Sequence, residues 1–181
     1  MSSPPLSDPP GAAPKAELAP LRVATLTLSD TRTPADDEGG RVLGELLRGA
    51  GFKVVSHEIL REDPHLLRET LIHGICALDV ADAVVMTGGT GIAPRDRTIE
   101  AITPVLQKVL YGFGEAFRRL SFDQIGPHAI LSRAVAGVIR GRVVIALPGS
   151  VRAVRLATEK LIVPMLRHAC DLASGRDTKH S

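Results

Sequence analysis

The stretch "DVADAVVMTGGTGIAPRD", residues 79–96, contains the two features that decide the fold. Its first half is a run of apolar, partly β-branched residues, which predicts a strand buried on both faces. Its second half packs three glycines, one proline and an Arg-Asp pair into ten residues. Such a loop is either a tight turn, because glycine reaches positive φ without steric cost, or a cradle whose backbone N–H groups approach a phosphate.

The flanking sequence continues the alternation of strands and helices. Strand patterns cover residues 21–30, 52–60, 81–89, 130–139 and 142–149, and helical patterns cover residues 39–49, 65–80, 97–106, 112–122 and 150–173. Pro104 is expected to break one helix and Pro164 to kink another, while Arg140 and Gly141 are expected to turn between the last two strands. This order predicts βαβ units, and therefore a three-layer α/β/α sandwich with a mostly parallel, doubly wound sheet.

Length and composition predict one domain. Residues 1–20 hold six prolines and no apolar core of signal-peptide length, so they predict a disordered tail before a domain at 21–175. No apolar stretch reaches the ~18 residues of a membrane helix, which predicts a soluble protein with no membrane partner. A net charge of +2 with 3% aromatic residues argues against nucleic acid.

The cysteines and histidines do not have a spacing typical of a metal site or a catalytic site. Cys76 and Cys170 stand within apolar helical patterns, where a free thiol usually behaves as a small buried hydrophobe. The six histidines are scattered singly and are expected on the surface or in packing. The absence of paired cysteines and of a targeting segment favours a cytoplasmic location.

Four polar segments follow predicted strands: "LSD" (28–30), "LRED" (60–63), the glycine loop (87–96) and "LPGS" (147–150). Because the carboxyl ends of parallel strands share one edge, these segments are expected on one rim. The glycine loop offers amides to a phosphate, and "LPGS" opens a helix whose first N–H groups favour a second anion. Two anion sites predict two phosphorylated ligands, or one long one.

Three aspartates at strand ends, Asp30, Asp63 and Asp96, are candidates to hold Mg²⁺ beside phosphates. Asp63 is equally compatible with a helix N-cap, and Asp96 with a local turn. The chain lacks the P-loop pattern GxxxxGK[ST] and the hydrolase elbow GxSxG. What remains is phosphoryl or nucleotidyl transfer by positioning and electrostatics, or ligand binding without chemistry.

Four blocks of sequence follow one another along the chain: "TGGTGIAPRDRTIEAI", "GFGEAFRRLSFDQIG", "LSRAVAG" and "ALPGS". In this order they resemble the molybdopterin-binding family, most closely its B branch, and the resemblance covers residues 23–172. It implies a molybdenum cofactor biosynthesis protein that binds molybdopterin and adenylylates it with Mg-ATP, releasing pyrophosphate.

The resemblance also implies roles for individual residues. Asp63 and Asp96 match the family's two functionally important aspartates, with the physical role of holding Mg²⁺ on the transferring phosphoryl group. The remaining candidates bind substrate or phosphate: Ser29, Asp30, Gly88, Gly89, Thr90, Gly91, Ser132, Arg133, Gly149 and Ser150. Arg133 suits this role because its planar fork pairs with phosphate oxygens.

Two alternatives stay open beside adenylylation. The chain has "LPGSV" where the adenylyltransferase branch commonly has "LPGNP", so non-catalytic molybdopterin binding is the first alternative. An assembly protein that presents the pterin to other molybdenum cofactor biosynthesis proteins is the second. The resemblance implies a homotrimer or homohexamer. Retention of Asp96 in "APRD" favours adenylylation.

Overall fold

The structure is a computed structural model that describes residues 19–176. Six strands form one mixed sheet in the order β2-β1-β3-β6-β5-β4. They are β1 (Arg22–Leu28), β2 (Lys53–Leu60), β3 (Ala83–Thr87), β4 (Lys108–Val109), β5 (Val135–Ile139) and β6 (Arg142–Leu147). β2, β1, β3 and β6 run parallel to their neighbours in that series, and β5 and β4 add an antiparallel edge.

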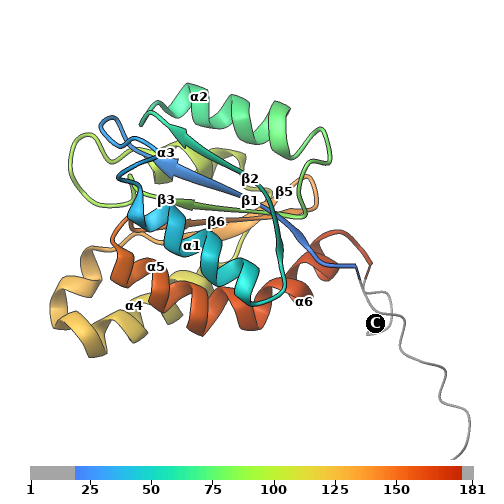
Figure 1. Ribbon diagram of the computed structural model, residues 1–181. Helices are drawn as coiled ribbons and strands as arrows, with labels where there is room; N and C mark the ends of the chain where they lie inside the picture. Colours follow the sequence, from blue (N-terminus) through green and yellow to red (C-terminus); the bar gives the residue numbers. More distant parts are fainter. Residues whose placement is uncertain (1–18, 177–181) are drawn as a thin grey trace, which may run out of the picture.

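Helices cover both faces of this sheet, as Figure 1 shows. On one face lie α1 (Glu38–Gly49), α4 (Tyr111–Ile125), α5 (Val151–Ala157) and α6 (Val163–Ala173). On the other lie α2 (Pro64–Glu69) and α3 (Thr98–Ile102). The predicted three-layer α/β/α sandwich is therefore confirmed. The predicted tail at 1–20 falls almost wholly on residues 1–18, which lie outside the described part of the chain.

The central strands are buried on both faces, as their apolar sequences predict. In β3, Ala83 and Val85 pack under α1 and α6, while Val84 and Met86 pack under α2 and α3. All five β3 residues are buried. Strands of this kind must be covered on both sides, because burying apolar surface stabilises the fold by about 25 cal/mol per Å².

Two predicted elements differ from the structure, and one observed strand was not predicted. The strand predicted at 130–139 begins only at Val135, because Gly126–Leu131 forms a 3-10 helix with Pro127 in its first turn. β4 was absent from the predicted strands, since a two-residue strand exists only through its pairing with β5. The helix predicted at 65–80 passes into a π-helical turn at Thr70–Ile75.

The predicted kink at Pro164 takes the form of a π-helical turn at Thr158–Ile162, between α5 and α6. Proline has no N–H, and its ring crowds the carbonyl four residues earlier. A wider turn relieves this crowding, and the Val163 N–H donates to Thr158 O, five residues back. The turn between β5 and β6 also agrees with prediction, since Arg140 and Gly141 both have positive φ, 49° and 75°.

Both cysteines are buried, as predicted. Burial raises the pKa of the Cys76 thiol to about 11 and that of Cys170 to about 12, so both remain protonated at neutral pH. None of the helices within residues 19–176 is long and apolar enough to cross a membrane.

Candidate functional site

The carboxyl ends of β1, β2, β3 and β6 meet around an open pocket of about 290 Å³, here called the strand-end pocket. Its lining residues are Leu28, Ser29, Asp30, Thr31, Arg32, Glu62, Gly88, Gly89, Arg95 and Gly149. All four segments that were expected to share one rim contribute lining residues, so that expectation is confirmed, and Thr31 and Arg32 extend the first segment. Arg32, Glu62 and Arg95 were not among the predicted site residues.

The glycine loop needs glycine at its first two positions. Gly88 has φ +96°, and a Cβ there would stand 2.3 Å from the Leu28 carbonyl oxygen. Gly89 has φ +63°, and a Cβ there would stand 2.2 Å from Thr98 Oγ1. Thr98, the first residue of α3, holds the loop by donating its hydroxyl to Gly88 O (3.0 Å) and its N–H to Gly89 O (3.0 Å). The glycine loop, which follows β3, therefore packs closely against the end of β1 and the start of α3.

A second pocket, of about 230 Å³, lies on the other side of the glycine loop and is here called the α4 pocket. Its walls are largely apolar, and polar side chains lie among them. Its lining residues are Thr90, Gly91, Phe117, Ser121, Gln124, Ile125, His128, Ala129, Leu131, Ser132, Pro148, Ser150, Arg152, Ala153 and Leu156. A ring system with polar substituents matches this kind of lining.

The predicted binding residues divide between the two pockets. Ser29, Asp30, Gly88, Gly89 and Gly149 line the strand-end pocket. Thr90, Gly91, Ser132 and Ser150 line the α4 pocket. The glycine loop and the "LPGS" turn thus each contribute to both pockets and lie between them. The binding roles themselves stay predictions.

Asp63 does not line either of these two pockets, but it borders an adjoining open hollow together with Asp30 and Glu62. Its carboxylate caps α2, where Oδ1 accepts the N–H groups of His65 (2.8 Å) and Leu66 (3.2 Å). These two backbone bonds hold the pKa of Asp63 below its usual value. The geometry is that of the N-cap alternative, and the catalytic role of Asp63 stays a prediction.

Glu62, which precedes Asp63 in the chain, lines the strand-end pocket where Asp63 does not. Its Oε2 is buried and has no hydrogen-bond partner among the described residues, and it lies 3.5 Å from where a Cβ on Gly89 would stand. Burial raises the pKa of this carboxyl, and the charges of Asp96 and Asp30 raise it further. The "D-P" cap pattern at 63–64 was the available signal, because it commits Asp63 to the helix and leaves Glu62 as the free carboxylate.

Asp96 closes the glycine loop on itself. Its Oδ2 accepts the Ala93 N–H at 2.9 Å, and a Cβ on Gly91 would stand 2.6 Å from the same oxygen. This is the local-turn alternative for Asp96, although its charge also acts on Glu62. Within residues 19–176, no three His, Cys, Asp or Glu side chains are grouped as a metal site.

Arg133 braces the glycine loop and does not line either pocket. Its guanidinium pairs with both carboxylate oxygens of Glu100 on α3 and donates to the carbonyl oxygens of Thr90 (3.4 Å) and Asp96 (3.0 Å). The fork that was expected to hold a phosphate is thus directed at three protein groups. Arg133 therefore ties the glycine loop to the segment that carries Ser132.

Arg133→Gln is expected to raise amide hydrogen exchange across residues 89–98 by roughly tenfold, the equivalent of about 1.4 kcal/mol of local stability. The reason is the loss of the Glu100 pair and of two carbonyl contacts. Mass spectrometry of exchanged peptides measures the change. Arg119→Gln is the matched control, because Arg119 is exposed on α4 and its substitution removes the same charge. Equal exchange in the two variants would contradict the bracing role.

The chain matches one model of a known protein family. Residues 24–168 match the model described as "Probable molybdopterin binding domain". The chain belongs to this molybdopterin-binding domain family. The resemblance seen in the sequence is therefore confirmed, and the match includes every residue named in the two pockets.

Relatives within the molybdopterin-binding domain family are similar over most of their length. A protein named molybdenum cofactor biosynthesis protein B from Bacillus cereus is 48% identical over 149 residues, which is 82% of this chain and 88% of the relative. A crystal structure of a molybdenum cofactor biosynthesis protein B has a TM-score of 0.81 at 44% identity, covering 90% of this chain and 98% of the other. The tungsten cofactor synthesizing protein MoaB from Pyrococcus furiosus has a TM-score of 0.77 at 37% identity, covering 90% and 99%.

Proposed function

We propose that this protein acts in molybdenum cofactor biosynthesis, where it binds molybdopterin and adenylylates it with Mg-ATP, releasing pyrophosphate. The observation that carries the proposal is the pair of pockets on either side of one glycine loop. A reaction that joins two phosphorylated molecules needs two adjacent sites that meet where their phosphates meet. The names of the relatives support the pathway, and the two-pocket geometry supports the reaction class.

In the proposed reaction, an oxygen of the terminal phosphate of molybdopterin attacks the α-phosphorus of ATP. A new P–O bond forms, the bond from the α-phosphorus to the bridging oxygen breaks, and pyrophosphate leaves with that electron pair. The chain's contribution is to hold the two phosphates together and in line, because phosphoryl chemistry depends on positioning and charge stabilisation. The glycine loop lines both pockets, and the start of α5, which is capped by Ser150, adds a positive dipole end beside the α4 pocket.

The residues of the strand-end pocket fit a divalent cation. Glu62 presents a buried carboxylate oxygen that has no hydrogen-bond partner within residues 19–176, and Asp30 and Asp96 lie close enough to raise its pKa. Mg²⁺ takes one or two protein carboxylates and keeps several waters, so Glu62 with Asp30 or Asp96 would hold it. When bound, it would neutralise charge on the phosphates. The metal role predicted for Asp63 is kept as a test, since its carboxylate is engaged with α2.

The proposal predicts product from purified protein with metal-free molybdopterin and Mg-ATP, followed as adenylylated pterin and pyrophosphate by chromatography. Asp96→Asn and Glu62→Gln are expected to lower the rate by at least roughly 10²-fold, the order seen when a charge-stabilising group is removed. Asp63→Asn tests whether Asp63 takes part in the chemistry or only caps α2. A cap retained by asparagine would leave the rate nearly unchanged.

No product, with tight pterin binding, would replace this proposal by the non-catalytic one. The assembly alternative has its own observation, because several large apolar side chains on α4, on the 126–131 segment and in the glycine loop are exposed: Ile92, Tyr111, Phe122, Ile130 and Leu131. The homotrimer or homohexamer, the partner proteins and the cytoplasmic location stay predictions.

A further inference from the structure

Arg32 is a cation of the strand-end pocket that is fixed in place before any ligand arrives. It follows β1, and its side chain is 33% exposed. Its NH1 donates to Asp37 Oδ1 (3.3 Å) and its NH2 donates to Gly149 O (3.2 Å). A guanidinium has five N–H donors, so these two bonds orient the fork and leave donors for a ligand.

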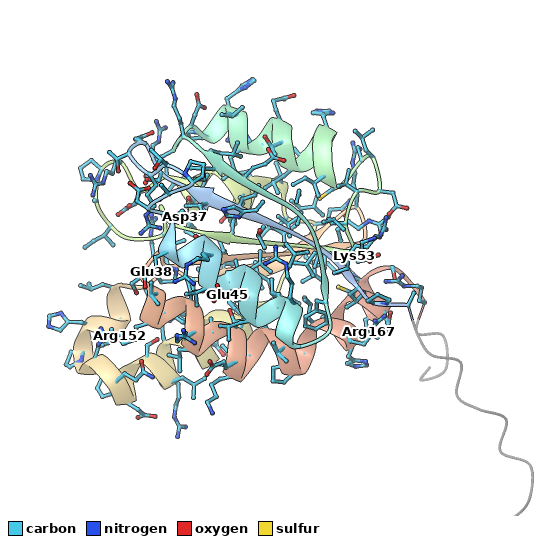
Figure 2. The ribbon with its side chains drawn as sticks, in the orientation of Figure 1. Asp37, Glu38, Glu45, Lys53, Arg152 and Arg167 are labelled. Carbon is cyan, nitrogen blue, oxygen red and sulfur yellow. The ribbon has the colours of Figure 1, made fainter. Side chains whose placement is uncertain are left out.

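Asp37, which holds Arg32, is among the most buried carboxylates of the described chain, with its side chain 2% exposed. Figure 2 shows it where α1 begins, at the end of the molecule to which the β1 arrow points. Besides Arg32, it accepts the Thr27 hydroxyl (2.6 Å) and the Gly40 N–H (3.0 Å). Burial alone would raise the pKa of Asp37, but hydrogen bonds from Thr27, Gly40 and His57 outweigh burial and lower it. The lowered pKa favours the charged carboxylate, and these contacts orient both of its oxygens.

His57 supports Asp37 from β2. Its Nε2 lies 3.0 Å from Asp37 Oδ2, and its Nδ1 lies 2.9 Å from Thr25 Oγ1. Gly40 makes room for this contact, because a Cβ there would stand 2.5 Å from the His57 ring. A chain of contacts thus leads from β2 through α1 to the pocket. His57, expected to be a surface or packing residue, has a definite structural partner.

Gly39 and Gly149 border the guanidinium at van der Waals distance. A Cβ on Gly39 would stand 3.4 Å from Arg32 NH1, and one on Gly149 would stand 3.8 Å from it. The carboxylate Glu62 approaches the pocket from the other side, at Gly89. Arg32, which follows β1, and Glu62, which follows β2, therefore approach the strand-end pocket from different strand ends. An anion beside Arg32 and a cation beside Glu62 would each lie next to a side chain of opposite charge.

We propose that Arg32 is the residue that binds a phosphate or pyrophosphate group in the strand-end pocket, and that Asp37 and His57 are positioning residues that hold it. The inference rests on the proposed function for the identity of the full ligand. The anion contact itself rests on the geometry above, because a planar fork held at two points pairs well with phosphate oxygens.

Titration of the full chain with inorganic pyrophosphate, by calorimetry, tests the contact without any turnover. Arg32→Gln is expected to weaken binding by roughly 30-fold, within the range of a charged hydrogen bond. Arg32→Lys separates contact from structure. Lysine keeps the charge but cannot span Asp37 and Gly149, so binding within about fivefold of wild type is expected if the charge meets the anion. Equal losses for glutamine and lysine would reduce Arg32 to a structural tie and overturn the proposal.

Two controls share the change of charge. Arg95→Gln alters the other arginine of the same pocket, which forms no hydrogen bond within residues 19–176, and is expected to weaken pyrophosphate binding less than Arg32→Gln. Arg119→Gln on α4 is expected to change nothing. No measurable pyrophosphate binding by the wild type, or a larger loss for Arg95→Gln, would also overturn the proposal.

A double-mutant cycle tests the positioning role. His57→Ala is expected to weaken pyrophosphate binding about fivefold in the wild type and to have no effect in the Arg32→Gln background, because it acts only through Arg32. Additive effects would contradict it. Pyrophosphate binding that depends on Arg32, in a protein that does not adenylylate molybdopterin, would refute the proposed function and keep this inference. Adenylylation that is unchanged in Arg32→Gln would keep the proposed function and refute this inference.

Discussion

Asp82→Ala is expected to lower the free energy of unfolding by about 3 kcal/mol, measured by urea denaturation. Asp82 precedes β3, at the opposite end of the sheet from the pockets, and is 6% exposed. Its carboxylate accepts the backbone N–H of Arg22 (2.9 Å) and lies 3.6 Å from the guanidiniums of Arg142 and Arg176. Alanine would leave that N–H and part of the positive charge without a partner.

Two comparisons separate this effect from ordinary surface charge. Asp171→Ala removes another partner of Arg176, at a more exposed position, and is expected to cost less than about 1 kcal/mol. The second comparison uses pH. Burial would raise the pKa of Asp82, but bonds from Arg22 and the charges of Arg22 and Arg176 lower it.

Because the folded-state pKa lies below the unfolded value, this carboxylate stabilises the fold above about pH 4, and the stabilisation is lost as pH falls through the folded pKa. The wild type should therefore lose more stability than Asp82→Ala on acidification. Parallel curves of unfolding free energy against pH would show that the charge of Asp82 is not involved.

Gly88→Ala is expected to cost about 4 kcal/mol of unfolding free energy, as the sum of a left-handed backbone for alanine and of overpacking. Gly88 has φ +96°, and the new Cβ would meet the Leu28 carbonyl oxygen at 2.3 Å. A backbone carbonyl of a central strand cannot move aside without disturbing β1. The same variant should bind pyrophosphate more weakly, since β1 and the glycine loop both line the strand-end pocket.

Gly51→Ala is the matched control for backbone conformation. Gly51 has φ +84°, but nothing lies within 4 Å of the position of its Cβ. Only the left-handed conformation is then penalised, by about 1 to 2 kcal/mol. Similar losses for the two alanine variants would show that the close approach of β1 to the glycine loop is unimportant.

The architecture was predictable because its signals are local. Apolar runs marked β1, β3 and β6, and spacing of four placed Leu67, Leu71 and Ile75 on one buried face. The hairpin turn followed from Arg140 and Gly141. β4 and the late start of β5 were missed, because pairing across the sheet and a 3-10 helix decide them.

The site was predictable only as far as the chain could be read one segment at a time. The rim and the glycine loop follow from strand ends, helix starts and the steric freedom of glycine. The direction of each polar side chain does not follow. Asp63 faces α2 and Glu62 the pocket, and the reason is the cap at the start of α2.

By itself, the sequence determined the α/β/α layers, the family and the rim on which polar segments gather, since each depends on residue types close together along the chain. Only the tertiary structure decided which charged groups meet there. Arg133 turns to Glu100 and the glycine loop, and Arg32 is held by Asp37 and Gly149. These contacts join residues from different elements, and their partners are chosen by geometry and burial, which no single segment encodes.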